Sequence, residues 1–419
     1  MGTTLCAAFL VVAASFLWAS SASAAKPATD PYIVVLKDDV AHPANVAHRH
    51  EENRGAELGH VYGTAIKGYS AELTLAEARA VRSDPTVDYV ARAGMTQLAA
   101  QTSSTGLRRV GALSNPTLDI DEVDDVQTNV DVAVIDTGID YDHPDLRVVS
   151  RTLCTYYNPE TPGKSYCVDG AGDDLLGHGS HVAGIIGAKD NGLGSVGVAP
   201  GARLWAVKVT KEAQGNVSDP DLLAGIDWVA ARANQIEVAN LSIAGKVSES
   251  TPGAVSALGK AIATSVNNGV VFVAGAGNWA KDANDYYPAN FSDVVTVSAV
   301  ADYDGQAGSL KGATTCQDTV SPFSSHGDVD DTFWRQFDSN GFEYGSNWGS
   351  AVDIAAPGVC IFSAYKNGEY RAMTGTSMAA PHVAGAAAIL AAKKNPNTRS
   401  EVEGIRTTLR NSGSSNWTD

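Results

Sequence analysis

The apolar segments between residues 130 and 300 most constrain the fold, because they alternate with segments of helical periodicity. Several have the length of buried strands: VDVAVIDTG, ARLWAVKV, EVANLSIAG, VVFVAGAGN and VVTVSAV. Helices are indicated after GHGSHVAG and at DLLAGIDWVAARAN and AVSALGKAIATSVNNG. This alternation predicts an α/β fold with a mostly parallel central sheet and helices on both faces. Ligands of such sheets bind at the carboxyl ends of the strands, where these segments turn polar or glycine-rich.

A small α+β unit is predicted ahead of this sheet, from residue 31 to about residue 93. YIVVLK, GYSAEL and VDYVARAG indicate strands, PANVAHRHEENRGAELGHVY a helix with its exit, and TLAEARAVRSD a second helix. The segment TQLAAQTSSTG that follows is polar and has no periodicity. It is typical of an exposed linker that a protease can cut.

Residues 1–24 have features of a secretory signal peptide. An apolar run precedes Ala22-Ser23-Ala24, the small-x-small pattern of a signal-peptidase site. A transmembrane anchor is the alternative, but the run is short for a span and no basic segment follows it. We therefore expect a secreted protein with no membrane attachment once this segment is removed. The formal net charge of -17 also argues against nucleic acid or an anionic membrane as a partner.

Three polar side chains at the predicted turns are candidates for chemistry. Asp136 follows the apolar run VAVI, where a structural Asp that caps a turn is the alternative. His178 opens an apolar helix; it is alternatively an interior histidine or, with His181, half of a metal site, although no nearby Cys or Glu completes a zinc site. Ser377, in MTGTSMAAPHVAG, lies at a helix start whose N–H groups suit a negative charge, and an ordinary N-cap is the alternative.

Together, Asp136, His178 and Ser377 supply what acyl transfer needs: a nucleophile, a base that takes its proton, and a carboxylate that orients the imidazole. Their order along the chain is Asp, His, Ser. This order differs from that of chymotrypsin and of the α/β-hydrolases, and Ser377 lacks the G-x-S-x-G elbow.

VAVIDTGID, GHGSHVAGIIG and GTSMAAPHVAG resemble the active-site motifs of the subtilisin-like serine peptidases, the subtilase family, in the family's order. The resemblance extends from residue 31 to about residue 415, since the first unit is similar to the family's inhibitory propeptide. It implies an inhibitory propeptide over residues 25–99 and a peptidase domain over residues 100–419, similar to the secreted bacterial subtilisin or proteinase K type. Because the family usually adds another strand and helix, we expect a domain truncated at its C-terminus.

The resemblance also assigns substrate-binding roles. Asn278 matches the oxyanion-hole Asn, and a turn-forming Asn is the alternative. Tyr286 is placed near the floor of the first specificity pocket, or packs without contacting substrate. A peptide bound by its extended backbone implies broad specificity with an apolar or aromatic preference at the cleaved residue. The residues implied to pair with that backbone and to wall the pocket are Ser242, Ile243, Ala244, Ala274, Gly275 and Ala276.

A structural calcium ion is the cofactor that the resemblance implies, and no catalytic cofactor is expected. All donors of the implied site are oxygens, as calcium requires; a polar turn without metal is the alternative. The implied ligands are Gln101, Asp145, Lys189, Asn191, Leu193 and Ser195, with the Lys, Leu and Ser contributing carbonyls. Since the family's matching ligand lies just inside the mature N-terminus, we predict propeptide cleavage between Leu98 and Gln101.

Four cysteines remain when the signal segment and its Cys6 are removed, an even number that suits an oxidising compartment. Three pairings are possible in principle. The short loop CTYYNPETPGKSYC favours Cys154 with Cys167, which leaves Cys316 with Cys360; free buried thiols are the alternative.

Two further segments carry hypotheses. Residues 302–349 are longer than the matching loop of a minimal family member, and they are interpreted as a substrate-side wall, a cation site or a solvated loop. The propeptide histidines are proposed to loosen its grip when protonated, and a solvated helix face is the alternative. They are His42, His48, His50 and His60.

We therefore expect a secreted, monomeric serine endopeptidase that acts on protein and peptide substrates and is made as a self-processing preproenzyme inhibited by its own propeptide. The alternative is a catalytically silent secreted protein that binds peptides in the same cleft, which would have no need of the triad together with Asn278. An esterase that uses the same triad is a further possibility.

Overall fold

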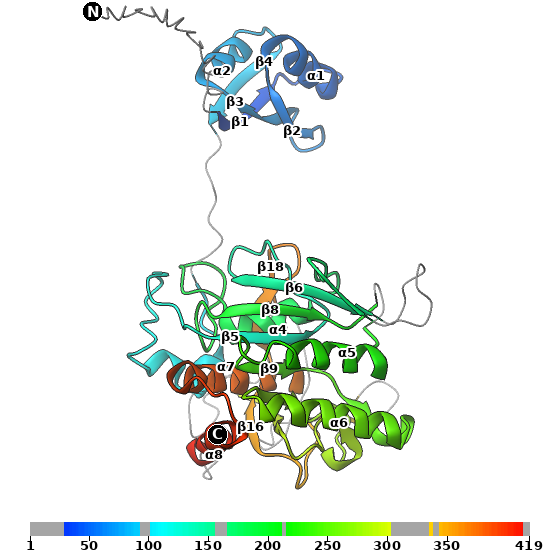
Figure 1. The fold of residues 1–419 in the computed structure, drawn as a ribbon. Helices are drawn as coiled ribbons and strands as arrows, with labels where there is room; N and C mark the ends of the chain where they lie inside the picture. The colour runs from blue at the N-terminus through cyan, green and yellow to red at the C-terminus, as the bar shows by residue number, and fades with distance from the viewer. Residues whose placement is uncertain are drawn as a thin grey trace, which may run out of the picture. The chain divides into compact units, whose positions relative to one another are not determined.

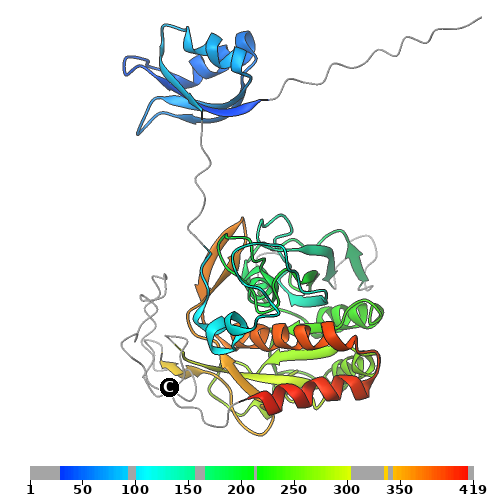
Figure 2. The same ribbon diagram turned by 90° about the vertical axis from the view of Figure 1, so that its left-hand side faces the viewer.

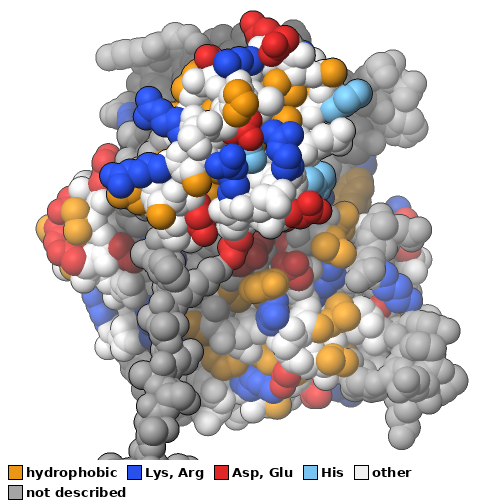
Figure 3. All heavy atoms as spheres, turned by 90° about the horizontal axis from the view of Figure 1, so that it is seen from above, with side chains coloured by type: hydrophobic (Ala, Val, Ile, Leu, Met, Phe, Trp, Pro, Cys, Tyr) orange, Lys and Arg blue, Asp and Glu red, His pale blue; other side chains and the backbone are white. Residues whose placement is uncertain are grey.

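The computed structural model describes residues 29–92, 101–155, 166–211, 215–302, 335–337 and 343–413. The chain divides into two compact units, Met1–Thr96 and Gln97–Asp419 (Figure 1). None of the helices in the described ranges has both the length and the apolar composition that a membrane span needs. In Figure 3, Lys and Arg side chains of the described residues are interspersed with Asp and Glu side chains.

The N-terminal unit is an antiparallel sheet in the order β2-β3-β1-β4, packed with two helices. Side chains of β1 alternate between buried and half-buried, and the buried ones form a core with residues of both helices. The predicted α+β unit is confirmed. Its elements are β1 (Asp30–Leu36), α1 (Pro43–Arg54), β2 (Glu57–Tyr62), β3 (Gly68–Leu73), α2 (Leu75–Arg82) and β4 (Val87–Arg92).

The segment expected to be a helix with its exit contains a strand as well. Helix α1 ends at Arg54 because Gly55 takes the left-handed conformation, with φ 77°, which glycine adopts without steric cost. Residues Glu57–Tyr62 then pair with β3. Of the histidines in this unit, His50 is fully buried, whereas the other three are exposed.

The C-terminal unit is built on an eight-stranded sheet in the order β16-β13-β11-β9-β5-β8-β6-β7. Neighbouring strands are parallel except β6 and β7, so the predicted fold class is confirmed. The chain places β8 on one side of β5 and β9 on the other, which makes the carboxyl end of β5 a topological switch point. The strands are β5 (Asp131–Asp136), β6 (Val148–Thr155), β7 (Tyr166–Asp169), β8 (Arg203–Lys208), β9 (Val238–Leu241), β11 (Val271–Gly275), β13 (Val294–Val300) and β16 (Ile354–Pro357).

Helices cover both faces of this sheet (Figures 1 and 2). Helices α4 and α7 contact each other, and α5 and α6 contact each other on the opposite face. The central strands β5, β9, β11 and β13 are buried along their whole length, which explains their apolar sequences. The helices are α3 (Thr105–Arg109), α4 (His178–Gly187), α5 (Asp219–Ala230), α6 (Pro252–Asn267), α7 (Thr376–Lys394) and α8 (Arg399–Ser412).

Among the residues that the structure describes, three short strand pairs lie outside the main sheet. They are β10 (Gly245–Lys246) with β12 (Tyr286–Tyr287), β14 (Arg335–Phe337) with β15 (Glu343–Gly345), and β17 (Ile361–Tyr365) with β18 (Glu369–Met373). The pair β14–β15 falls within the segment 302–349, most of which lies outside the described residues.

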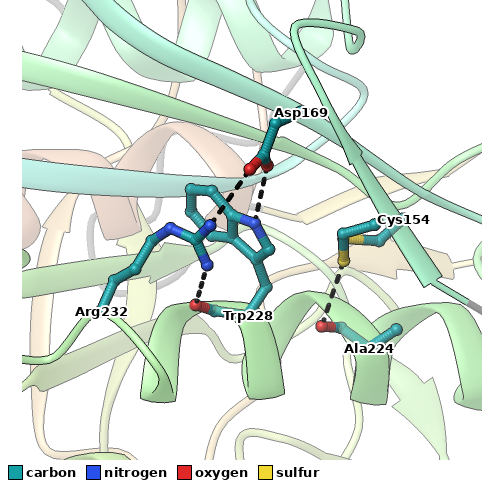
Figure 4. Close-up of a disulfide and its surroundings, with 6 residues drawn as sticks. Cys154, Asp169, Ala224, Trp228 and Arg232 are labelled. Atoms are coloured by element: carbon teal, nitrogen blue, oxygen red, sulfur yellow. Dashed lines mark hydrogen bonds and ion pairs between the residues drawn. A yellow bond between two sulfur atoms is a disulfide. The ribbon is translucent and has the colours of Figure 1, made fainter.

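A disulfide joins Cys154 in β6 to Cys167 in β7, as the short loop between them predicts (Figure 4). The same strand β7 is tied to α5 through Asp169, which accepts hydrogen bonds from Trp228 Nε1 at 3.0 Å and from Arg232 at 3.2 Å. Cys360 is also disulfide-bonded. Its expected partner, Cys316, lies outside the described residues.

Candidate active site

Asp136 and His178 meet at the carboxyl end of β5. Asp136 is the last residue of that strand and is 1% exposed, and His178 is the first residue of α4. Their side chains are joined by a hydrogen bond of 2.7 Å between His178 Nδ1 and Asp136 Oδ1. Gly177, with φ 94°, lets the Tyr365 ring pack against the backbone just before His178, because a Cβ there would lie 2.3 Å from that ring.

The Asp136 carboxylate controls the protonation of His178. Burial by itself would lower the pKa of His178, but the charge of Asp136 and its hydrogen bond outweigh burial, and the pKa is raised. Since Nδ1 donates to Asp136, the neutral imidazole keeps Nε2 as the acceptor. A base in this tautomer can take a proton from a hydroxyl group in the adjoining cleft.

Ser377 lies in the first turn of α7, beside the end of β9. Its Oγ donates to the carbonyl of Ser242 at 3.4 Å, and Ser242 Oγ donates to the carbonyl of Ser377 at 2.9 Å. Within the described residues, no hydrogen bond joins Ser377 to His178. Catalytic hydrogen bonds are often long without substrate and tighten in the complex. Because Ser242 lines the same cleft as His178, Ser377 Oγ is hydrogen-bonded to a residue of the wall of that cleft.

The side chain of Asn278 is fixed by Thr376. Asn278 Oδ1 accepts hydrogen bonds from the Thr376 N–H at 2.9 Å and from Thr376 Oγ1 at 3.0 Å. Thr376 Oγ1 in turn accepts the N–H of Gly277 at 3.1 Å. With its oxygen occupied in this way, Asn278 retains an NH₂ group as a donor next to Ser377, which suits an oxyanion.

Thr376 and Asn347 were not identified from the sequence. Asn347 is fully buried; its amide donates to the carbonyl of Ala276 at 2.9 Å and accepts the N–H groups of Trp279 at 3.1 Å and Lys281 at 3.0 Å. It therefore fixes the chain on both sides of Asn278. The position of Thr376 in the GTS motif, directly before Ser377, is a signal that could have identified it. Nothing in the sequence around Asn347 indicates its contacts with the backbone near Asn278.

A cleft of about 700 Å³ runs from the Asp136–His178 pair along the segment after β9. Of the predicted substrate-binding residues, Ser242, Ile243 and Ala244 line it. Ala274, Gly275 and Ala276 are buried and are not among the residues that line it. Gly275 instead lies under Thr376, since a Cβ there would be 3.0 Å from Thr376 Oγ1.

Tyr286 is buried and packs against an exposed tryptophan. Its ring stacks on that of Trp279, with centroids 4.6 Å apart and an interplanar angle of 7°. Trp279 is 40% exposed. His181, named from the sequence only as a possible partner of His178 in a metal site, is fully buried; its Nε2 lies 2.9 Å from the carbonyl of Arg371, and burial lowers its pKa to about 3.

The predicted calcium ligands lie together although they are distant in sequence. Gln101 Oε1 accepts the N–H groups of Asn191 and Gly192, both at 3.2 Å, and Asp145 Oδ2 accepts the N–H of Ser195 at 3.2 Å. The adjoining backbone is held by a hydrogen bond of 2.8 Å from the N–H of Thr102 to the carbonyl of Gly194. The loop 189–195 is thus closed over both side chains.

Asp145 provides the test of whether a cation fits this site. It is fully buried, its Oδ1 has no hydrogen-bond partner, and burial raises its pKa to about 7. A buried carboxylate is costly unless a charge or a donor compensates it. In the described part of the chain, no group of three or more His, Cys, Asp or Glu side chains could hold a metal. The remaining donors would be amide and carbonyl oxygens, which calcium accepts.

The chain matches known proteins over both units. It matches the Subtilase family model over residues 127–417 and the Peptidase inhibitor I9 model over residues 31–99. It is 32% identical over 425 residues to the Alkaline protease of Alkalihalobacillus alcalophilus, a match that covers 99% of this chain and 94% of that protein. With Alkaline serine exoprotease A of Vibrio alginolyticus it is 33% identical, over 82% of this chain and only 55% of that protein. The match to a solved structure described as S41 Psychrophilic Protease covers 75% of this chain and 90% of the solved chain, at 26% identity and a TM-score of 0.53.

Proposed function

The chain belongs to the subtilase family of serine peptidases and carries an I9-type inhibitor domain, and we propose that Asp136, His178 and Ser377 are its catalytic triad. The observation that carries this proposal is the 2.7 Å bond between Asp136 and His178, in a cleft bordered by the residue to which Ser377 is hydrogen-bonded. The proposed activity is hydrolysis of peptide bonds, with broad specificity and an apolar or aromatic preference at the cleaved residue.

In the proposed mechanism, substrate binding turns Ser377 Oγ from the Ser242 carbonyl towards His178 Nε2. Ser377 attacks the scissile carbonyl carbon while His178 takes its proton, and Asp136 stabilises the imidazolium. The Asn278 amide and the Ser377 N–H stabilise the oxyanion. His178 then gives the proton to the leaving amine, and water releases the acyl group by the same steps in reverse.

We propose that Ser377 cuts the chain between Leu98 and Gln101, a segment that begins outside the described residues, and that the α+β unit then inhibits the peptidase until it is degraded. The I9 match supports the inhibitory role. The small-x-small pattern at residues 22–24 supports secretion, and the disulfide supports an oxidising compartment. The proposed active form is a monomer.

A structural calcium ion is proposed between Gln101 and the loop 189–195. The residues that would hold it are Gln101, Asp145, Lys189, Asn191, Leu193 and Ser195. When bound, the ion supplies the positive charge that buried Asp145 lacks. One carboxylate oxygen of Asp145 has no hydrogen-bond partner, which supports this placement of the ion.

The experiment that tests the triad compares the full chain with its Ser377→Ala variant by intact mass and N-terminal sequencing. We expect the unmodified chain to be cut between Leu98 and Gln101, and the variant to stay whole. A fluorophosphonate probe should label the unmodified chain at Ser377. If the folded chain is neither cut nor labelled, the triad is inactive and the alternative, a silent peptide-binding protein, is favoured.

A further inference from the structure

The end of the cleft remote from the Asp136–His178 pair carries charged side chains that the proposed mechanism does not use. Two segments form it: the start of α5 with the residues just before it, and β10 with the short turn that follows it. Asp219 comes from the first segment, and Lys246 and Glu249 from the second. Leu222 and Ile243 add apolar walls between them and the middle of the cleft.

Asp219 is held in place as a carboxylate. Its Oδ1 accepts the hydroxyl of Tyr287 at 2.6 Å, and its Oδ2 accepts the hydroxyl of Ser250. Burial, together with the hydrogen bond to Asp219, raises the pKa of Tyr287 to about 12, so this donor keeps its proton. Asp219 also lies in the first turn of α5, where the helix dipole favours a negative charge. It is half-buried and faces the cleft with a fixed orientation.

The lysine at this end is paired with the other carboxylate. Lys246 Nζ lies 3.8 Å from Glu249, and both side chains are largely exposed. Within the described residues, Asp219 forms no ion pair with a Lys, Arg or His side chain. Thr210, which lines the same cleft, is 2% exposed and its Oγ1 has no hydrogen-bond partner. Asp219 is therefore a carboxylate at this end of the cleft that has hydroxyl donors but no ion-pair partner among the described residues.

We propose that Asp219 selects a Lys or Arg side chain of the substrate, bound at this end of the cleft and away from the scissile bond. A basic side chain suits the site because its methylene stem packs on Leu222 and Ile243 while its charged group reaches the carboxylate. The inference rests on the proposed peptidase function and names a substrate feature that the apolar or aromatic preference at the cleaved residue does not include.

The test uses matched fluorogenic peptides with one apolar residue at the cleavage site. Each of the four positions on the acyl side carries in turn Lys, Arg, Gln or norleucine. At one position remote from the scissile bond, we expect kcat/KM for Lys and Arg to exceed that for Gln and norleucine by about fivefold, as a partly buried ion pair gives. Asp219→Asn should abolish the preference while keeping the shape of the side chain. Added salt should weaken it.

Two variants separate a charge effect from a packing effect. Glu249→Gln should weaken the preference, because it leaves the positive charge of Lys246 without its partner. Lys246→Gln should strengthen the preference, a change of opposite sign to that of Asp219→Asn. A preference that survives in Asp219→Asn, or that is absent in the unmodified chain, overturns the inference.

Labelling with a simple fluorophosphonate is measured beside each assay. A chain that labels but shows no basic preference overturns this inference alone and leaves the proposed function intact. A chain that neither labels nor hydrolyses any peptide overturns the proposed function, and this inference falls with it. A labelled, folded Asp219→Asn variant that hydrolyses the norleucine peptides normally and has lost only the preference supports the inference.

Discussion

Thr376→Val tests whether the orientation of Asn278 depends on its neighbour. Thr376 is 2% exposed, and valine has nearly the same shape, so the substitution removes little besides the hydroxyl group. Two contacts are lost: the hydrogen bond of 3.0 Å to Asn278 Oδ1, and the acceptor for the Gly277 N–H at 3.1 Å. The N–H of residue 376 remains as the other anchor of Asn278, at 2.9 Å.

The expected magnitude follows from these contacts. Leaving the buried Gly277 N–H without an acceptor should lower the free energy of unfolding by about 1–3 kcal/mol. Loss of one of two anchors, about 1 kcal/mol, should lower the equilibrium constant for the productive orientation of Asn278 about fivefold. Complete removal of such a donor in a subtilisin lowers turnover by about 10²- to 10³-fold, which sets the upper limit. We therefore expect kcat to fall by at most about fivefold, with KM nearly unchanged.

The assay combines steady-state hydrolysis of a peptide substrate with urea unfolding, the latter in the Ser377→Ala background so that self-digestion does not interfere. Thr376→Ser, which keeps the hydroxyl group, is the matched control and should restore kcat. If Thr376→Val is destabilised but keeps the kcat of the unmodified chain, the hydroxyl group supports only the fold, and Asn278 is positioned without it.

Four further predictions concern other parts of the chain. Because the pKa of His178 is raised, the acidic limb of the kcat/KM profile should have its midpoint above pH 6.5, the ordinary histidine value. Asp136→Asn should move that limb to lower pH, and an unmoved limb contradicts the pairing of Asp136 with His178. Calcium at a hundredfold excess over its Kd should stabilise the chain by about 3 kcal/mol in thermal unfolding, and Asp145→Asn should lose most of that response; equal responses exclude this site. Replacing Cys154 with Ser should cost about 3 kcal/mol in urea unfolding, given a separation of 13 residues from its partner, and an unchanged midpoint refutes the estimate. Burial lowers the pKa of His50, so the unfolded N-terminal unit binds a proton more readily, and the stability of this unit should fall as pH drops from neutral to about 5. Hydrogen-exchange protection factors of residues 30–92 in the Ser377→Ala chain measure this stability. Protection factors that do not change with pH disprove the prediction.

The hypothesis that protonation of propeptide histidines loosens the propeptide now concerns His50 alone. His50 is fully buried and lies between Tyr69, with Nδ1 2.5 Å from the Tyr hydroxyl, and Asp84, with Nε2 3.0 Å from Oδ2. His42, His48 and His60 are exposed, so they match the alternative of a solvated surface. The sequence placed all four in one unit but carried no sign of which side chain is enclosed.

The sequence predicts those strands and helices whose formation depends mainly on residues close by in the chain. The central strands β5, β9, β11 and β13 are buried on both faces, so their apolar runs are continuous and were recognised. Segment 57–62 was misinterpreted because its exposed, mixed pattern resembles a helix exit; it is a strand because Gly55 ends α1 and β3 offers a pairing edge. The sequence of residues 57–62 does not show that β3 is available to pair with them.

The sequence by itself determined the fold class and the residues at the ends of the strands, since apolar periodicity and glycine-rich turns depend on near neighbours. Only the tertiary structure decided how those residues meet. The contact between Asp136 and His178 spans 42 residues, and that between Asn278 and Thr376 spans 98. Contacts over such separations depend on strand order and on the packing of α4 and α7, which the whole chain fixes together. For the same reason the anchoring of Asn278 by Thr376 and the charge at Asp219 became visible only in the folded molecule.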